Sequence, residues 1–236
     1  VIAIIVSGII MKKTQLFAGD PAPFVMELPA YHWPTLGNIL RSMWERGWSF
    51  IKKAGTIILL SAILLWFLMN FGFEEGGFGM VGDLNHSILA NIGNSIAWIF
   101  APLGFGNWQS AVAAITGLIA KENVVSTFGI LYGGFDEVAE NGWQIWVNMR
   151  EAFTPLAAYS FLVFNLLCAP CFAAMGAIKR EMNNGKWTLF AIGYQCVFAY
   201  VVSLIIYQIG MLFSGAASIP GLIAAVVLLA LLLYLL

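Results

Sequence analysis

Two cysteines three positions apart form the part of this sequence best suited to chemistry. Cys168 and Cys171 flank Pro170 inside an apolar stretch, and their spacing predicts that both sulfurs lie on one face of a helix. Pro170 has no N–H to donate to the carbonyl of Leu166, so it kinks the helix and frees carbonyl oxygens beside two thiols. Sulfur ligands suit Fe(II), Cu(I) or Zn(II) and not Na⁺, K⁺ or Mg²⁺. Met175 offers a thioether one turn further on.

Lys121 and Glu122 form a second candidate group, because they interrupt the apolar stretch 110–131. Each isolated charge at the centre of a bilayer costs at least ~2.5 kcal/mol, so an ionisable residue at that depth is a functional candidate. Adjacent helical residues point about 100° apart, so each is expected to find its own partner. Two plainer interpretations stay open: a Lys–Glu pair that locks neighbouring helices, and a loop between two short half-helices.

The cysteine pair and the remaining candidate residues also have a plainer, structural interpretation. Cysteine packs as a small hydrophobe and a proline kink is ordinary in membrane helices, so the pair at 168 and 171 need not bind a metal. Cys196 has no polar partner in its apolar stretch and is interpreted as packing. His32 and His86 lie in predicted loops and are expected to be solvated. Glu27, also in a loop, is kept as a weak candidate ligand.

The composition places these residues in a membrane protein. Of the 236 residues, 61% are hydrophobic and only 10% are charged, and the mean hydropathy is +0.86. Uncharged runs occupy 54–73, 87–120, 123–135, 152–178 and 187–236, and several reach the roughly 20 residues that a crossing helix needs. The net charge of −1, with scattered basic residues, argues against a nucleic-acid partner.

These patterns predict an all-α, polytopic transmembrane helical bundle with an amphipathic interfacial helix. Residues 1–11 are interpreted as the tail of a truncated transmembrane helix. Residues 12–53 are expected to form a cytoplasmic loop, with four of the eight prolines, and then the amphipathic helix 36–53. Residues 54–236 are expected to form the transmembrane bundle, with spans near 54–73, 88–103, 110–131, 154–178, 187–213 and 219–236. The 88–103 segment is short enough to be a re-entrant half-helix.

The charged loops predict an orientation. Segment 12–53 carries six Lys and Arg against three acids, and 179–186 carries three basic residues. Segment 74–87 has three acids and no basic residue, and 132–153 has four acids and one. If 88–103 and 110–131 both cross, the positive-inside rule makes the first two segments cytoplasmic and the last two external. Cys168 and Glu122 then lie about 16–18 Å from the cytoplasmic ends of their helices, near the midplane where transporters place their sites.

Three stretches resemble the C-terminal membrane domain of the FeoB family of bacterial ferrous iron transporters. They are PFVMELPAYHWPTLGNILRSMWERGWSFIKKAGTIIL, TGLIAKENVVSTFGILYG and FNLLCAPCFAAMGAIKRE, in the family's order, and the resemblance runs from about residue 8 to 213. In that family two gate regions contain the cysteines proposed to handle Fe(II). Cys168, Pro170 and Cys171 match the second gate motif, and Glu122 matches the acid of the family's Ala-Lys-Glu. The first gate cysteine belongs upstream of this chain.

The resemblance implies Fe(II) transport into the cytoplasm through the bacterial inner membrane, crossed several times. It implies Fe(II) as a transported ion and no permanently bound cofactor, with GTP and Mg²⁺ handled only by a GTPase domain upstream. That domain, small cytoplasmic accessory proteins and further copies of the chain are the expected partners. No GxxxxGK[ST] phosphate loop occurs in the sequence, so the chain by itself is not expected to be an enzyme.

Two other functions stay open from the residues alone. A membrane thiol oxidoreductase would use Cys168 and Cys171 as a redox pair, although such a pair needs access to a partner thiol or quinone near a membrane face. A transporter of a nucleoside-like solute is the second alternative, because gate folds resemble one another across families and a fold does not fix a function.

Overall fold

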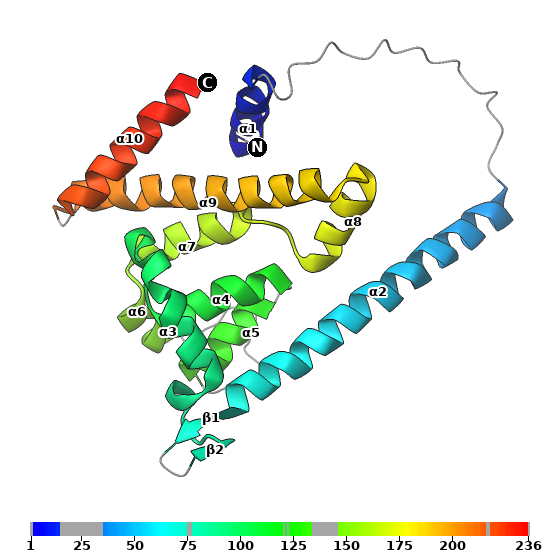
Figure 1. Ribbon diagram of the computed structural model, residues 1–236, viewed down its shortest axis with the longest axis horizontal. Helices are drawn as coiled ribbons and strands as arrows, with labels where there is room; N and C mark the ends of the chain where they lie inside the picture. The colour runs from blue at the N-terminus through cyan, green and yellow to red at the C-terminus, as the bar shows by residue number, and fades with distance from the viewer. Residues whose placement is uncertain are drawn as a thin grey trace. The chain divides into compact units, whose positions relative to one another are not determined.

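The computed structural model describes residues 2–14, 35–74, 77–119, 121, 123–133, 146–215 and 218–235. The chain divides into two compact units, Val1–Thr56 with Ala230–Leu236, and Ile57–Leu229. Nearly all described residues are helical, as the coils of Figure 1 show. The predicted all-α class is therefore confirmed apart from one small hairpin of strands.

Two helices begin in the first unit. Helix α1 (Ile2–Lys13) is apolar and ends on Lys12 and Lys13, where positive charge suits the carbonyl end of a helix. Helix α2 (Leu36–Asn70) has 35 residues and a length of about 52 Å. It runs unbroken through 53/54, where the sequence suggested a surface helix followed by a separate span. No proline occurs between 35 and 101, so no residue in this stretch forces the helix to end.

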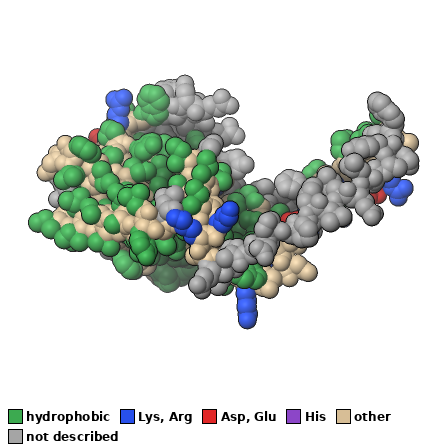
Figure 2. All heavy atoms as spheres, turned by 90° about the horizontal axis from the view of Figure 1, so that it is seen from above, with side chains coloured by type: hydrophobic (Ala, Val, Ile, Leu, Met, Phe, Trp, Pro, Cys, Tyr) green, Lys and Arg blue, Asp and Glu red, His purple; other side chains and the backbone are tan. Residues whose placement is uncertain are grey.

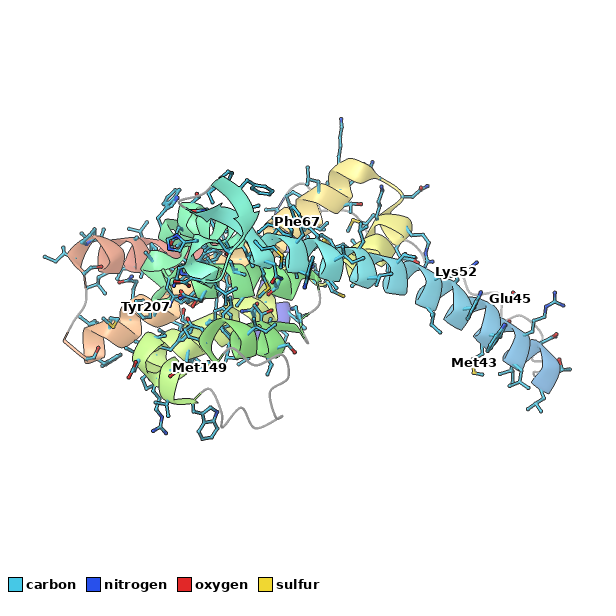
Figure 3. The ribbon with its side chains drawn as sticks, turned by 90° about the horizontal axis from the view of Figure 1, so that it is seen from below. Met43, Glu45, Lys52, Phe67, Met149 and Tyr207 are labelled. Carbon is cyan, nitrogen blue, oxygen red and sulfur yellow. The ribbon has the colours of Figure 1, made fainter. Side chains whose placement is uncertain are left out.

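The N-terminal half of α2 presents mixed side chains. Arg41 Nε donates to Glu45 Oε1 at 3.1 Å, one turn apart on the exposed surface. The rings of Trp44 and Trp48 stack with their centroids 5.9 Å apart. Figure 3 shows Met43 and Glu45 projecting from this half of the helix. The mixture agrees with an interfacial helix, which stays a prediction.

A β-hairpin follows α2, where the sequence suggested the end of a span and a loop. Strands β1 (Phe71–Glu74) and β2 (Gly77–Met80) pair antiparallel, with Phe71 opposite Met80. A short 3₁₀ turn, η1 (Leu84–His86), leads into the next helix. A side chain at Gly72 would collide with the backbone of His86, so only glycine fits there. The apolar FGF run resembles the end of a membrane helix, and its residue pattern alone does not distinguish a β-strand from a helix end.

The next segment bends sharply. Helix α3 (Ile88–Phe100) is capped by Ser87, whose side chain accepts from the Ala90 N–H, and it ends in the 3₁₀ turn η2 (Ala101–Leu103). Helix α4 (Trp108–Ile119) follows at an angle of 90°. Gly104, at the bend, has φ +91°, and a side chain there would collide with the ring of Tyr207 on helix α9 (Gly185–Phe213), labelled in Figure 3.

The expected span 110–131 is a helical hairpin. Helix α5 (Asn123–Phe128) continues into a π-helical turn, η3 (Gly129–Gly133), and this arm returns along α4. Thr116 Oγ1 and Thr127 Oγ1 are 3.2 Å apart, and Asn107 Nδ2 donates to the Tyr132 hydroxyl at 3.2 Å. In a straight helix, residues 107 and 132 would be about 37 Å apart. The prediction of a single straight span here is wrong, and the alternative of two half-helices is confirmed.

The remaining helices belong to the second unit, apart from the end of α10, which belongs to the first. They are α6 (Trp146–Ala152), α7 (Pro155–Leu167), α8 (Phe172–Met182), α9 (Gly185–Phe213) and α10 (Ile219–Leu235). Helix α7 lies along α9 in Figure 1. Ser160 and Ser203 join them: their hydroxyl oxygens are 2.8 Å apart, and Ser203 Oγ donates to the Ser160 carbonyl at 2.7 Å. Small residues at this contact allow close approach.

Aromatic rings and alanines fill the core of the second unit. Phe105, Phe128 and Phe161 are buried. The ring centroid of Phe161 lies 5.1 Å from that of Phe105 and 5.2 Å from that of Phe128, and alanines of α4, α7 and α9 surround these rings. The outer sides are also apolar, since Leu162 on α7 and Val197 on α9 are strongly exposed. In the face drawn in Figure 2, hydrophobic side chains cover most of the described surface. Such a surface matches contact with lipid.

Helix length gives a smaller number of crossings than the sequence suggested. Among the described residues, α9 is the one helix that is both long and apolar enough to cross a membrane, and the bent pair α3–α4 adds a second if it is counted as one broken span. The segments 124–133, 155–167 and 219–235 are apolar but shorter. The six-crossing arrangement therefore stays a prediction for most of its spans.

Candidate metal path at two helix breaks

The cysteine motif lies in a break between helices. Helix α7 ends at Leu167, and α8 begins at Phe172. Cys168 (φ −60°, ψ 165°) and Cys171 (φ −57°, ψ 159°) are extended residues that flank the break. The prediction that both sulfurs lie on one face of a kinked helix is wrong. Residues before proline avoid the helical conformation, and this proline removes a helical donor, so the chain unwinds over four residues.

A lysine supplies the donor that the proline removes. In an unbroken helix the carbonyl of Leu166 would accept from the N–H of residue 170, which is Pro170. Lys121 Nζ, at the tip of the α4–α5 hairpin, donates to that carbonyl at 3.4 Å. A cation at the carbonyl end of a helix is also favoured by the helix dipole. The two interruptions that stood out in the sequence therefore meet, 45 residues apart in the chain.

The neighbouring turn fits the hairpin tip against α7. Asn165 donates to the carbonyl of Phe161 at 3.2 Å, which leaves its Oδ1 directed at the tip. A methyl group at Gly117 would lie 2.7 Å from Asn165 Oδ1 and 3.0 Å from a methyl of Val124. A larger residue at this crossing would therefore require the side chain of Asn165 or the hairpin to shift. The sequence analysis missed Asn165, although a polar residue one turn before Cys168 in an apolar stretch was a usable signal.

The sulfur nearest to Cys168 comes from another helix. Cys168 Sγ lies 3.7 Å from Cys196 Sγ on α9, and all three cysteines are free thiols. Cys168 is buried and Cys196 is half-buried against the same core. The interpretation of Cys196 as packing without a polar partner is thus incomplete, because the packing of α7 against α9 brings it to Cys168. No spacing rule in the sequence connects residues 28 positions apart on different helices.

The other predicted ligands are less well placed. Met175 is partly buried and packs against the hydrophobic core. Glu122 and Glu27 lie outside the described residues. Within the described ranges no group of three or more His, Cys, Asp or Glu side chains is placed to hold one metal ion. The two neighbouring sulfurs of Cys168 and Cys196 offer a metal ion a partial shell, which suits passage more than storage.

A cavity of about 430 Å³ lies beside the hairpin, apart from the cysteines. Its walls come from α2, α3, α4 and the α5 arm, and the three cysteines are not among its lining residues. Asn70, Thr116, Ser126 and Thr127 supply its polar side chains, and the rest of the lining is mainly apolar. A polar solute such as a nucleoside would meet few hydrogen-bonding partners there.

Comparison with known proteins gives consistent matches. The family model described as the C terminus of ferrous iron transport protein B matches residues 1–46, and the Gate model, described as nucleoside recognition, matches residues 51–185. The Fe(2+) transporter FeoB of Staphylococcus aureus (strain COL) is 37% identical over 213 residues, which cover 90% of this chain and 30% of that protein. The Methanocaldococcus jannaschii transporter of the same name is also 37% identical, over 90% of this chain and 31% of its own length.

A third relative joins two functions in one chain. It is the Fe(2+) transport protein A/Fe(2+) transporter FeoB fusion protein of Porphyromonas gingivalis, 34% identical over 86% of this chain and 29% of its own length. The present chain thus spans about a third of the length of the relatives it matches. No solved structure matches it significantly.

Proposed function

The chain belongs to the Gate family, as the C-terminal gate domain of a FeoB protein, and on that premise we propose that it forms part of the path by which Fe(II) crosses the membrane into the cytoplasm. The relatives are named as Fe(2+) transporters, and they are about three times as long as this chain. GTP binding and hydrolysis belong, in this proposal, to a domain outside the chain, since the sequence has no phosphate loop. Accessory-protein contact is likewise proposed, and the fusion relative supports it.

One observation carries the proposal: two broken helices meet at the cysteine motif through Lys121 and the Leu166 carbonyl. Membrane transporters place ion sites at discontinuous helices, where unwound backbone offers carbonyl oxygens that a regular helix would use internally. Here the unwound segment also contains two thiols, which favour a thiophilic ion over an alkali ion. The charge of Lys121 thus lies at the helix break that contains the cysteine motif.

Lys121 has a specific part in this proposal. Its ammonium group occupies the carbonyl that would otherwise be open to a cation, so an incoming Fe(II) must displace it or bind beside it. Glu122, the adjacent acid, is proposed to offset the charge of the ion, in line with the family motif. Binding must stay weak enough for release, and an incomplete protein shell serves that purpose.

The thiol oxidoreductase is less favoured by the geometry. Cys168 is buried, and its break lies beside Cys196, eleven residues or about 16 Å into α9. A redox pair has to reach a partner thiol or quinone, which is harder from that depth. The nucleoside-like transporter would need a polar cavity, and the cavity beside the hairpin is mainly apolar.

Uptake of ⁵⁵Fe(II) by cells that express the full-length transporter tests the proposal. Cys168→Ser and Glu122→Gln should each lower the uptake rate several-fold at unchanged abundance in the membrane, because each replaces a ligand by a poorer one of similar size. Val197→Ser is the matched control, since it adds a hydroxyl on the exposed side of α9 and should leave uptake near wild type. Wild-type uptake in both site variants would overturn the proposal.

A further inference from the structure

Cys196 is the part of the cysteine cluster that the sequence motif does not explain. It stands 25 positions after Cys171, on α9, and matches none of the three stretches that carry the family resemblance. Its sulfur nevertheless lies 3.7 Å from that of Cys168. The contact joins the end of α7 to α9, and the buried Ser160–Ser203 pair about two turns away holds these two helices together. The sulfur pair therefore lies beside an established helix–helix contact.

The separation of the two sulfurs fits a shared metal ion. Thiolates bind a tetrahedral divalent ion at about 2.3 Å, which holds two sulfurs about 3.8 Å apart. The observed 3.7 Å needs almost no movement to reach this value. Cys171 does not complete a three-residue cluster with them, because no group of three metal-ligating side chains occurs in the described ranges. From this geometry we propose that Cys168 and Cys196, rather than Cys168 and Cys171, form the two-sulfur site for the transported thiophilic divalent ion.

The position of the pair along α9 suits a transport site. Cys196 is eleven residues from the start of this 29-residue helix, so it lies within about 5 Å of the helix midpoint. The carbonyl of Leu166, two residues before Cys168 in the chain, accepts from Lys121. Two sulfurs leave the other coordination positions to water or to mobile ligands. Cys171, at the start of α8, is then a later or alternative contact along the path.

This inference rests on the proposed Fe(II) path, and metal binding tests it separately from uptake. Purified full-length transporter in detergent is titrated with Co(II) without oxygen, and the thiolate-to-cobalt charge-transfer absorption in the near ultraviolet is recorded. Cys168→Ser and Cys196→Ser should each reduce this absorption by at least half, and Cys171→Ser should keep it. Val197→Ser, next to Cys196 on the exposed side, is the matched control. An absent band in the wild type, or a band that survives Cys196→Ser and disappears in Cys171→Ser, overturns the inference.

A second measurement needs no substitution of Cys196. Dibromobimane becomes fluorescent when it bridges two neighbouring thiols, so full-length protein in which Cys168 and Cys196 are the only cysteines left should become fluorescent. Protein in which Cys171 and Cys196 are the only cysteines left should not. The reverse pattern overturns the proposed pair even if every variant folds.

The two proposals fail in different ways. Wild-type uptake in Cys168→Ser, with the cobalt band lost, would refute the Fe(II) path through these sulfurs and leave the pair as a metal site. Lowered uptake in Cys168→Ser, with a normal cobalt band in Cys196→Ser, would refute the role of Cys196 alone.

Discussion

At the scale of single residues, buried hydroxyl and carbonyl groups form hydrogen bonds with each other and so set how the helices pack. Ser160 and Ser203 are fully buried, and they exchange hydrogen bonds across the α7–α9 contact. Each would be costly alone in such surroundings, because a buried hydroxyl without a partner loses its hydration and gains nothing. Lys121 is exposed, and it donates to the carbonyl of Leu166, whose helical donor Pro170 removes.

The serine pair predicts an unequal effect of two alanine substitutions. Ser203→Ala removes the 2.7 Å bond to the Ser160 carbonyl as well as the contact between the hydroxyls, whereas Ser160→Ala removes that contact and the longer 3.3 Å bond from Ser160 Oγ to the Ser203 carbonyl. Both substitutions should therefore destabilise, Ser203→Ala by about 1–2 kcal/mol and Ser160→Ala by less, because the bond to a carbonyl that it removes is longer. Thermal unfolding in detergent measures this as a larger fall in Tm for Ser203→Ala. Ser95→Ala, which removes an exposed bond within one helix, is the control, and a larger effect at 160 than at 203 would contradict the geometry.

Broken helices decide the arrangement at the scale of elements. The α4–α5 hairpin turns back at Lys121, and α7 and α8 are separated by the cysteine motif. The two helix breaks contact each other through Lys121 and the carbonyl of Leu166. Near this contact Gly117 closely approaches Asn165, whose side-chain oxygen would have to move to admit a side chain at position 117. The meeting of the breaks should then be sensitive to a single methyl group.

Gly117→Ala tests that sensitivity. The added methyl would lie 2.7 Å from Asn165 Oδ1, so it should push the hairpin tip from α7 and lower Fe(II) uptake several-fold. Asn165→Ala in the same protein should restore part of the uptake, because it removes the obstructing oxygen. Gly193→Ala, on α9 with open space around it, is the control and should be neutral. Normal uptake in Gly117→Ala would show that the contact between the breaks is not required.

Membrane topology belongs to the scale of the whole molecule. The predicted arrangement had 88–103 and 110–131 each crossing, which placed 104–109 in the cytoplasm. In the structure Asn107 contacts Tyr132, and Gly104 contacts Tyr207 toward the C-terminal end of α9. If neither 88–103 nor 110–131 crosses, every charged loop keeps its expected side, with 74–87 and 132–153 external and 179–186 cytoplasmic. In that alternative topology only the 104–109 turn changes sides, and it becomes external.

Single-cysteine labelling distinguishes the two topologies. In full-length protein in which every native cysteine is replaced by alanine, Gln109→Cys should react with an impermeant maleimide added to intact cells. Glu181→Cys, in the basic 179–186 segment, should react only after the cells are opened. Protection of Gln109→Cys in intact cells would restore the straight crossing at 110–131, and outside labelling of Glu181→Cys would reverse the orientation.

The sequence by itself determined the class of this protein, its family and the two places that matter. Charge is so costly in an apolar bundle that Lys121 stood out without any coordinates, and Pro170 identified the carbonyl of Leu166 as open because a missing N–H is a local property. Only the tertiary structure decided which groups pair with the carbonyl of Leu166 and with the thiol of Cys168. Lys121 reaches Leu166, and Cys196 reaches Cys168, only because helices far apart in the chain pack together. Local spacing gives the position of a residue on its own helix, and contacts between helices depend on breaks, turns and close packing that no period in the sequence records.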